Sequence, residues 1–301
     1  MKLRVAACQI LTSPSPAESV DKIVAWMGRA ADDGVAVVAF PEASVCGYAA
    51  DPHYWERADP RDFAAAEARV IAEAARLRLA VVLGTAHWEG DRVYNSLLLI
   101  DQDGTIRGRY AKTHLAERWP APGRRLLVAD LAGVPSCFIV CHDVRYPELV
   151  RLPAIAGAQV CYYCSNESGL LQEYKLSAYR AMPIARATEN GIYLVMANAP
   201  ANPEDLRSPS QSHGNSKIVH PNGNVLVEPG HFDERLVVAT IDLDAADRRV
   251  ALRAANDDTI LRDWMRQGVA LVEGVPPDEP SGQATGNGRP ATAERAAPVA
   301  R

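Results

Sequence analysis

The chain alternates short apolar runs with longer amphipathic stretches. The short runs are rich in Val, Ile, Ala and Phe and are bounded by polar or turn-forming residues, a pattern typical of buried β-strands. They are Arg4–Cys8, Val35–Phe40, Ala80–Thr85, Ser136–Val140, Gln159–Tyr163, Ile192–Ala197 and Leu236–Ile241. The sequence therefore predicts a sheet-forming protein with a buried β core.

Helical spacing separates several of these runs. Within Pro16–Asp32, apolar side chains recur three and four positions apart from Val20 to Ala31, which predicts an amphipathic helix. Similar patterns occur at Ala64–Leu79 and Pro147–Ala156. Residues Glu173–Asn190 are also helical in composition, but Pro183 is expected to kink this helix or to start a new one.

Two hairpins interrupt this β/α alternation. Tyr94–Ile100 and Thr105–Tyr110 flank an Asp-Gln-Asp-Gly turn, and Lys217–His220 and Asn224–Glu228 flank a turn containing Asn-Gly. Hairpins exclude a purely parallel sheet. They indicate mixed sheets that carry helices on their outer faces.

The last part of the chain has a different composition. Residues 275–301 are rich in Pro, Gly, Ala and Thr and contain almost no large apolar side chain. Burial in such a segment cannot offset the entropy of ordering it, so we expect one domain over residues 1–274 and a disordered tail over 275–301.

Composition and charge restrict the partners. The 301 residues carry a formal net charge of −5 without a cluster of Lys and Arg, which argues against binding to nucleic acid. Apolar runs stay well below the ~20 residues needed to span a bilayer, and the N-terminal run is too short for a signal-peptide core. We expect a cytoplasmic protein with no membrane partner.

The cysteines and histidines do not suggest a metal site. Cys161 and Cys164 form a C-x-x-C pair, but the pair lies in a β-branched and aromatic run and no second pair completes four ligands. Residues three apart in a strand point to opposite faces, so both are expected to be core thiols. The histidines show no H-x-x-x-H spacing, and we expect neither a metal nor a cofactor.

Three apolar strands end in polar residues that suggest chemistry. Glu42 follows one run, Lys112 ends a second, and Cys141 ends a third just before a turn and Pro147. Alone, Glu42 is compatible with capping a turn, Lys112 with a surface lysine, and Cys141 with another buried thiol. Together they suggest a nucleophile on a tight turn, since a nearby lysine and a helix N-terminus favour a thiolate.

The three segments resemble the three motifs of the nitrilase superfamily, the carbon–nitrogen hydrolases. They are Phe-Pro-Glu at 40–42, Lys-x-His-Leu at 112–115, and Cys-x-Asp-x-Arg-Tyr-Pro-Glu at 141–148, in the family's order. The Tyr-Asn-Ser at 94–96, the Ala-Arg-Ala-x-Glu-Asn at 185–190 and the Gly-Asn-Ser at 214–216 resemble further family segments. The resemblance extends from Leu3 to about Leu252.

This resemblance implies a fold and an assembly. The family fold is an α/β four-layer α-β-β-α sandwich with two mixed β-sheets, usually assembled as homodimers or larger homo-oligomers. By position, Glu42, Lys112 and Cys141 correspond to the family's Glu-Lys-Cys triad. Glu117, which precedes a Pro-Gly turn, corresponds to the family's second glutamate, although a solvated loop carboxylate is the alternative.

These residue types suit the cleavage of an amide. Glu42 would take the thiol proton of Cys141, the thiolate would attack the carbonyl, and Glu42 would then protonate the leaving amine and activate water against the thioester. Lys112 and the backbone N–H of His142 would stabilise the oxyanion.

The substrate is expected to be a small amide or N-carbamoyl compound. The residues from Cys141 to Glu148 resemble the nucleophile motif of amidases and N-carbamoyl amino-acid hydrolases. Asp143 is expected to cap the following helix, whereas Arg145 either pairs with Glu148 or binds a substrate carboxylate. Further candidates for the substrate pocket are Tyr48, Trp119, Tyr146, Asn166 and Glu167.

Other functions remain open from sequence. A cysteine peptidase would leave Glu42 and Lys112 without a role, and a non-catalytic binding protein is expected to have lost a member of the triad. An N-acyltransferase or a nitrile hydrolase on the same fold uses the same residues, so the sequence does not separate them from an amidase.

Overall fold

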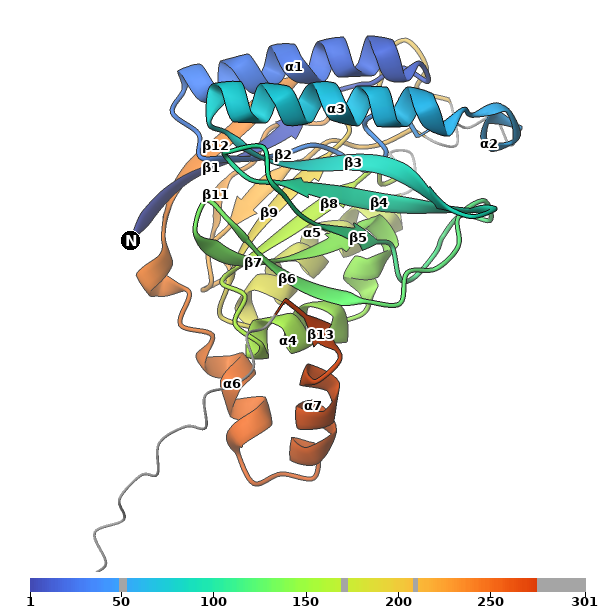
Figure 1. The fold of residues 1–301 in the computed structure, drawn as a ribbon. Helices are drawn as coiled ribbons and strands as arrows, with labels where there is room; N and C mark the ends of the chain where they lie inside the picture. Colours follow the sequence, from blue (N-terminus) through green and yellow to red (C-terminus); the bar gives the residue numbers. More distant parts are fainter. Residues whose placement is uncertain (49–52, 169–172, 208–210, 275–301) are drawn as a thin grey trace, which may run out of the picture.

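The computed structural model describes residues 1–48, 53–168, 173–207 and 211–274. The predicted tail at 275–301 lies outside these residues. Two β-sheets form the centre of the structure (Figure 1). The first sheet has the strand order β12-β1-β2-β3-β4-β5 and the second has the order β11-β10-β9-β8-β7-β6-β13.

Parallel and antiparallel pairings occur in both sheets. The strands of the first sheet are β1 (Lys2–Gln9), β2 (Val37–Ala39), β3 (Ala80–Glu89), β4 (Arg92–Ile100), β5 (Ile106–Ala111) and β12 (Arg235–Asp242). Those of the second sheet are β6 (Leu126–Leu131), β7 (Val134–Val140), β8 (Val160–Ser165), β9 (Tyr193–Asn198), β10 (Lys217–Val219), β11 (Val225–Val227) and β13 (Val272–Glu273). Because β7, β8 and β9 run parallel, their carboxyl ends lie side by side.

Helices cover the outer faces of both sheets. Helices α1 (Pro16–Asp32) and α3 (Pro60–Leu77) lie side by side over the first sheet, and α4 (Glu148–Ile155) and α5 (Glu173–Thr188) cover the second (Figure 1). The short helix α2 (Tyr54–Arg57) precedes α3, and α6 (Arg249–Asn256) and α7 (Arg262–Val269) project beyond α4. None of the helices in the described ranges combines the length and the apolar character needed to cross a bilayer.

Three apolar layers hold these elements together. The middle layer fills the space between the two sheets and contains Val5, Val37, Phe138 and Tyr162. A second layer joins the first sheet to α1 and α3, and a third joins the second sheet to α4 and α5. Burial on both faces explains why the strand sequences are continuously apolar instead of alternating. The predicted four-layer α-β-β-α sandwich is confirmed.

Individual elements follow the sequence pattern closely. Helix α1 has the predicted bounds, because the Ser15 side chain accepts a hydrogen bond from Glu18 N and Pro16 opens the first turn. Cys161 and Cys164 are free buried thiols that lie in different apolar layers, so they point to opposite faces of the sheet as expected.

Helix α5 differs from one of the two expectations. It continues through Pro183 as one helix, so no new helix begins there. Tyr179 and Ala187, one turn on either side of the proline, both pack in the third apolar layer. This packing on both sides of Pro183 compensates for the backbone hydrogen bond that proline cannot donate.

Candidate active site

Cys141 lies at the junction between strand β7 and a tight turn. Strand β7 ends at Val140, and residues Cys141–Arg145 form one 3-10 turn. Cys141 has a φ of +46°, a left-handed conformation that costs a non-glycine residue on the order of 1–3 kcal/mol. Only 6% of the residue is exposed. The surrounding structure thus holds a reactive side chain in a strained position at a strand end.

Asp143 stabilises this turn through hydrogen bonds to its carboxylate. Its Oδ2 accepts hydrogen bonds from Val140 N at 3.1 Å and from the Tyr110 hydroxyl at 2.9 Å, and its Oδ1 accepts one from His114 N at 2.7 Å. The expectation that Asp143 caps helix α4 is wrong, because its carboxylate points into the protein and is used by these three donors. It fixes the Cys141 turn to the loop that follows Lys112.

Glu42 is buried and fully hydrogen bonded. It lies three residues after strand β2 and is 2% exposed. Its Oε1 accepts hydrogen bonds from Lys112 Nζ at 2.8 Å and from Asn95 Nδ2 at 2.7 Å. Its Oε2 accepts one from Asn166 N at 2.9 Å. The carboxylate therefore has one fixed orientation at the carboxyl end of β2.

Lys112 bridges two glutamates. Its ammonium group donates to Glu42 Oε1 and to Glu117 Oε1, the latter at 2.6 Å. The Tyr48 hydroxyl also donates to Glu117 Oε1 at 2.6 Å. The structure thus places Glu117 beside Lys112, which excludes the alternative of a solvated loop carboxylate.

Two glycines allow the backbone to come close behind these residues. A Cβ atom on Gly84 would lie 1.9 Å from the carbonyl oxygen of Pro41, the residue before Glu42. A Cβ atom on Gly123 would lie 2.1 Å from the carbonyl oxygen of Ala111, the residue before Lys112. The position of each site residue therefore requires a glycine at the point where the neighbouring strand or loop contacts the preceding carbonyl.

Burial and charge shift the pKa values of the residues in this cluster in different directions. Burial raises the pKa of Glu42, and the positive charge of Lys112 offsets this effect only in part. Burial also acts to raise the pKa of Glu117, but there Lys112 outweighs it, so the pKa of Glu117 is lowered. Burial acts to lower the pKa of Lys112, yet the negative charges around it hold that pKa well above its usual value. Glu117 is thus a permanent partner of the ammonium, whereas Glu42 is the better proton acceptor and donor.

The thiol of Cys141 is protonated in the resting site. Burial raises its pKa well above the usual value, and the carboxylates of Glu167 and Glu42 add to the effect. Its Sγ donates a hydrogen bond to Glu167 Oε1 at 3.3 Å. Within the described part of the chain, no hydrogen bond joins Sγ to Glu42. Ionisation of the thiol therefore requires a base that acts when substrate is bound.

The remaining candidates lie around this centre. His142 and Tyr146 contact each other edge to face, and Tyr146 also stacks on His114 with 3.4 Å between ring centroids. Trp119 stacks on Trp55 at 3.7 Å. These contacts hold the side chains of Tyr146 and Trp119 in aromatic pairs.

Arg145 is exposed at the edge of the site. Its Nε donates to the Tyr179 hydroxyl at 3.2 Å, and its guanidinium lies 5.2 Å from the centre of that ring. Among the described residues it forms no ion pair with Glu148, so the expected structural pair is absent there. Its terminal nitrogens form no ion pair with a carboxylate of the described residues and remain able to bind an anionic group.

The structure adds polar residues that the sequence did not single out as site residues. Asn95 binds Glu42, and its only signal in the sequence was its place in the Tyr-Asn-Ser strand. Tyr163 donates to Glu167 at 3.1 Å, and Asn198 accepts from Glu167 N at 2.9 Å. Tyr163 lies within an apolar strand and carries no local signal, whereas Asn198 ends its strand as a polar residue, which was its only signal.

Comparison with known proteins identifies the family. The model of the carbon-nitrogen hydrolase family matches residues 4–249. The chain belongs to the carbon-nitrogen hydrolase family. This carbon-nitrogen hydrolase is 31% identical over 281 residues to the protein named hydrolase Rv0480c of Mycobacterium tuberculosis, covering 85% of this chain and 96% of that one.

Amidases are among the similar proteins. The 2-oxoglutaramate amidase of Bacillus subtilis is 32% identical over 171 residues, covering 55% of this chain and 62% of that one. The crystal structure of an amidase from Nesterenkonia sp. is similar with a TM-score of 0.72 at 27% identity, covering 87% of this chain and 96% of that one. The predicted nitrilase superfamily membership is confirmed, and the protein is a carbon–nitrogen hydrolase.

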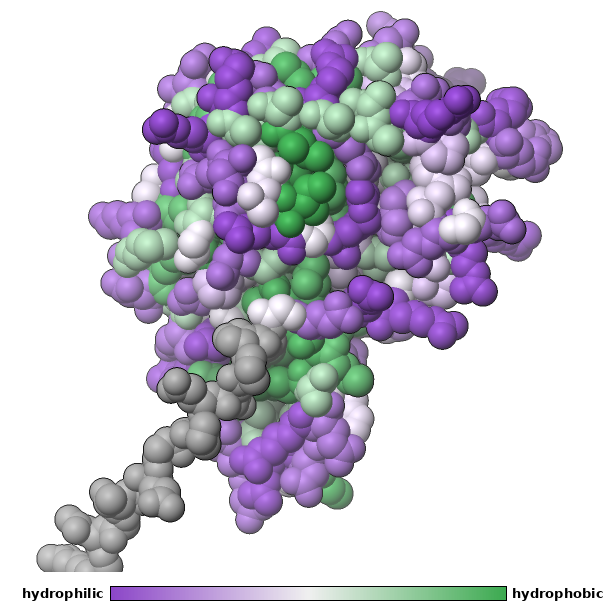
Figure 2. Space-filling model, in the orientation of Figure 1, coloured by the Kyte–Doolittle hydropathy of each residue, from purple (hydrophilic) through white to green (hydrophobic). Residues whose placement is uncertain are grey.

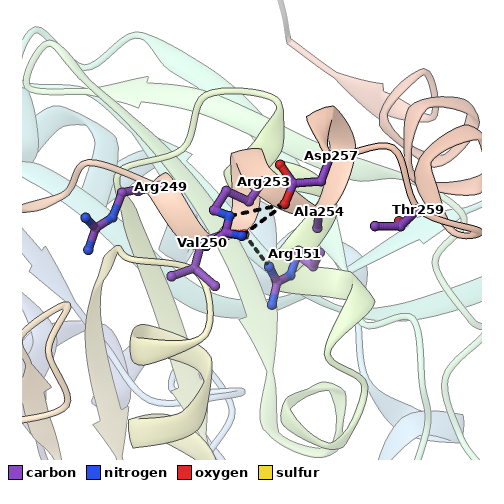
Figure 3. Close-up of a pocket in the computed structure, with 7 residues that line it drawn as sticks. All are labelled: Arg151, Arg249, Val250, Arg253, Ala254, Asp257 and Thr259. Carbon is purple, nitrogen blue, oxygen red and sulfur yellow. Dashed lines mark hydrogen bonds and ion pairs between the residues drawn. The ribbon is translucent and has the colours of Figure 1, made fainter. Parts of the chain in front are cut away.

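A separate surface pocket of this carbon-nitrogen hydrolase lies between α4 and α6. It has a volume of about 550 Å³, and its lining includes Arg151, Arg249 and Arg253 but none of the site residues above (Figure 3). Arg253 pairs with Asp257 at 3.2 Å, and Arg151 donates to Val250 O. In the part of the chain that the structure describes, no cluster of His, Cys, Asp and Glu could hold a metal ion.

Proposed function

We propose that this carbon–nitrogen hydrolase cleaves small linear amides or N-carbamoyl compounds through a thioester on Cys141. The observation that carries the proposal is the conjunction of a thiol on a strained strand-end turn with a lysine held between two buried carboxylates. Such a site offers a nucleophile, a proton carrier and an oxyanion partner that are all buried from water.

The reaction would proceed in two stages. Glu42 takes the Sγ proton as the sulfur attacks the carbonyl carbon, and Lys112 with the His142 N–H stabilises the oxyanion. Glu42 then passes the proton to the departing nitrogen, and ammonia or an amine leaves. Water enters, gives a proton to Glu42 and attacks the thioester, which releases the carboxylic acid and restores the thiol. General acid–base catalysis of this kind typically contributes ~10²–10⁴-fold in rate.

A positively charged residue at the edge of the site suggests that the substrate carries a carboxylate. Arg145 presents an exposed guanidinium on the turn that begins at Cys141, and Tyr179 holds its Nε side. Arginine suits a carboxylate because its nitrogens match both oxygens. An N-carbamoyl amino acid would place its carboxylate a few bonds from the carbonyl that Cys141 attacks. We also propose a cytoplasmic location, supported by six unpaired thiols that suit a reducing compartment.

The test is ammonia release from a panel of small amides, N-carbamoyl amino acids and nitriles. Wild type and Cys141→Ala are measured side by side, and thermal unfolding verifies that both are folded. We expect release from amides or carbamoyl compounds by wild type and none by the variant. Equal release from both proteins would refute a Cys141-dependent reaction, and release from nitriles alone would favour a nitrile hydrolase.

A further inference from the structure

Glu167 places a third buried carboxyl group against the nucleophile. It follows strand β8 and is 3% exposed. Its Oε1 accepts hydrogen bonds from Cys141 Sγ at 3.3 Å and from the Tyr163 hydroxyl at 3.1 Å. The reaction scheme above gives this carboxyl no task, because Glu42 already carries the proton.

This carboxyl has no cationic partner among the described residues. Lys112 binds Glu42 and Glu117, and Arg145 binds the Tyr179 hydroxyl. Burial raises the pKa of Glu167 to about 7, although its hydrogen bonds from Cys141 and Tyr163 and the charge of Lys112 counteract the rise. A buried acid without a cation is costly unless a ligand supplies a donor or a charge.

The backbone holds Glu167 firmly in this position. Its N–H donates to Asn198 Oδ1 at 2.9 Å, and Asn198 Nδ2 donates to Gly214 O at 2.7 Å. The next residue, Ser168, forms a β-bridge with Ser212. The backbone that carries the Glu167 carboxyl is therefore fixed beside Cys141, and the Tyr163 hydroxyl holds the carboxyl itself.

We propose that Glu167 selects substrates that carry a nitrogen-borne hydrogen-bond donor next to the scissile carbonyl, such as the inner N–H of an N-carbamoyl compound or the ammonium of an α-amino amide. This inference rests on the proposed function. When Sγ becomes acylated it loses its hydrogen, so Glu167 Oε1 loses one of its two donors. The group attached to the acyl carbon then lies beside Oε1, and an N–H borne by that group restores the lost hydrogen bond.

The expected selectivity follows from the strength of such a contact. A hydrogen bond involving a charged group contributes about tenfold to a hundredfold in affinity, whereas a methyl or methylene group at that place does not replace the donor that Glu167 Oε1 has lost and leaves it with the Tyr163 hydroxyl. A carboxylate at the same place would face Glu167 with like charge. Glu167 thus distinguishes a carbamoyl compound from an alkyl amide of the same shape.

Three substrates of nearly equal size test the proposal. Propionamide has a methyl group where glycinamide has an ammonium, and a methylene group where N-methylurea has an N–H. The kcat/KM of wild type and Glu167→Gln is measured for each compound by ammonia release. For each compound, the kcat/KM of the variant is divided by that of wild type. The intrinsic reactivities of the compounds therefore cancel when these ratios are compared. We expect Glu167→Gln to lose at least about tenfold more on glycinamide than on propionamide.

A matched variant and a binding experiment complete the design. Glu204→Gln makes the same change at an exposed carboxylate and is expected to leave all three ratios unchanged. Binding of the three compounds to Cys141→Ala is followed by NMR titration, with and without Glu167→Gln. Tighter binding of glycinamide that Glu167→Gln removes supports the inference.

The two proposals fail in distinguishable ways. Equal ratios for glycinamide and propionamide, or equal binding of both to Cys141→Ala, would overturn the role of Glu167 while amide hydrolysis stands. Absence of Cys141-dependent ammonia release from the whole panel would overturn the proposed function. The binding data would still decide whether Glu167 recognises a nitrogen donor.

Discussion

Glu42 and Glu117 share one lysine but are not equivalent. Lys112 donates to both, yet the pKa of Glu42 is raised and that of Glu117 is lowered. Burial is the larger influence on Glu42, which is also fully enclosed, whereas Glu117 receives the Tyr48 hydroxyl in addition. Two carboxylates whose environments separate their pKa values commonly divide into a proton carrier and a fixed charge.

Replacing Glu42 with Gln tests this division. Gln keeps the size of the side chain and can still accept the hydrogen bonds from Lys112 and Asn95, but it cannot take a proton. We expect kcat to fall by at least ~10²-fold with little change in the thermal unfolding temperature. Ammonia release and a melting curve measure both quantities. Normal turnover in Glu42→Gln would show that another group carries the proton.

Glu167 is expected to lower stability at neutral and alkaline pH. Its pKa is about 7 in the folded chain and near 4.5 when unperturbed. Between these values the unfolded state loses its proton first, so stability falls as pH rises from about 4.5 to 7 and stays lowered above that. Glu167→Gln removes this penalty. Urea unfolding should therefore show the variant gaining about 1–3 kcal/mol relative to wild type between pH 4.5 and pH 8.

The comparison between the two proteins isolates Glu167. Buried acids that do not interact with Glu167, such as Asp143, contribute equally to wild type and variant, so their titrations cancel. A pH-independent difference in stability would mean that the Glu167 pKa is close to 4.5 in the folded chain.

Residues differ in how far the sequence could predict them. Glu42, Lys112 and Cys141 each lie in a short motif, so their grouping could be inferred without a fold. The contact of Glu167 with Cys141 could not, because it depends on the parallel pairing of β7 and β8, in which Val140 lies opposite Cys164. Asp143 was mispredicted because two of its three donors come from β5 and the loop after it, which are distant in the sequence.

At the level of elements, the close approach of two backbones supports the site. Gly84 in β3 lies against the Pro41 carbonyl, and its own carbonyl accepts hydrogen bonds from the Ser44 hydroxyl and from Val45 N. The loop that carries Glu42 is thus tied to the middle of a strand. A side chain on that strand would push the loop away.

The substitution Gly84→Ala tests this support. A Cβ atom 1.9 Å from a carbonyl oxygen forces the loop to move. We expect a loss of about 2–4 kcal/mol in the free energy of unfolding, and a fall in kcat/KM of ~10²-fold because Glu42 shifts.

The matched control is Gly28→Ala in helix α1. A Cβ atom there meets no heavy atom within 4 Å. Ala favours a helix over Gly by about 0.5–1 kcal/mol, so this variant should be slightly more stable and fully active. Similar behaviour of the two alanine variants would contradict the proposed support.

Elements with strong periodicity were predicted best. Helix α1 and the central strands have bounds close to those expected, because apolar burial and capping residues are encoded locally. Helices α6 and α7 and strands β6 and β13 were not predicted. Strand β13 consists of two residues and exists only through its pairing with β6, a contact between distant parts of the chain.

At the scale of the whole molecule, a single chain leaves several large apolar side chains exposed to solvent. Large exposed apolar side chains gather on and beside α6 and α7, which project from the body of the sandwich (Figures 1 and 2). They are Val250, Ile260, Leu261, Trp264 and Leu271. Large apolar side chains that are exposed on neighbouring elements commonly mark a protein interface.

We expect a homodimer or larger homo-oligomer that uses this surface, as the family resemblance implies. Trp264 is 50% exposed, and Trp264→Lys should weaken the assembly because a buried charge in an interface is costly. Sedimentation velocity measures the shift toward monomer. Ile106→Lys, at an exposed apolar residue on β5, serves as the control and should leave the assembly intact. A monomeric wild type would contradict the prediction.

The burial of the cysteines allows the functional active sites in a preparation to be counted by chemical labelling. Five thiols have no exposed surface, whereas Cys141 is 6% exposed. Iodoacetamide, itself a small amide, should therefore alkylate one sulfur per native chain and all six after unfolding. Intact mass measurement would then give the fraction of competent molecules in any preparation before a natural substrate is known. Labelling at more than one sulfur in the native state would reveal opening of the β core.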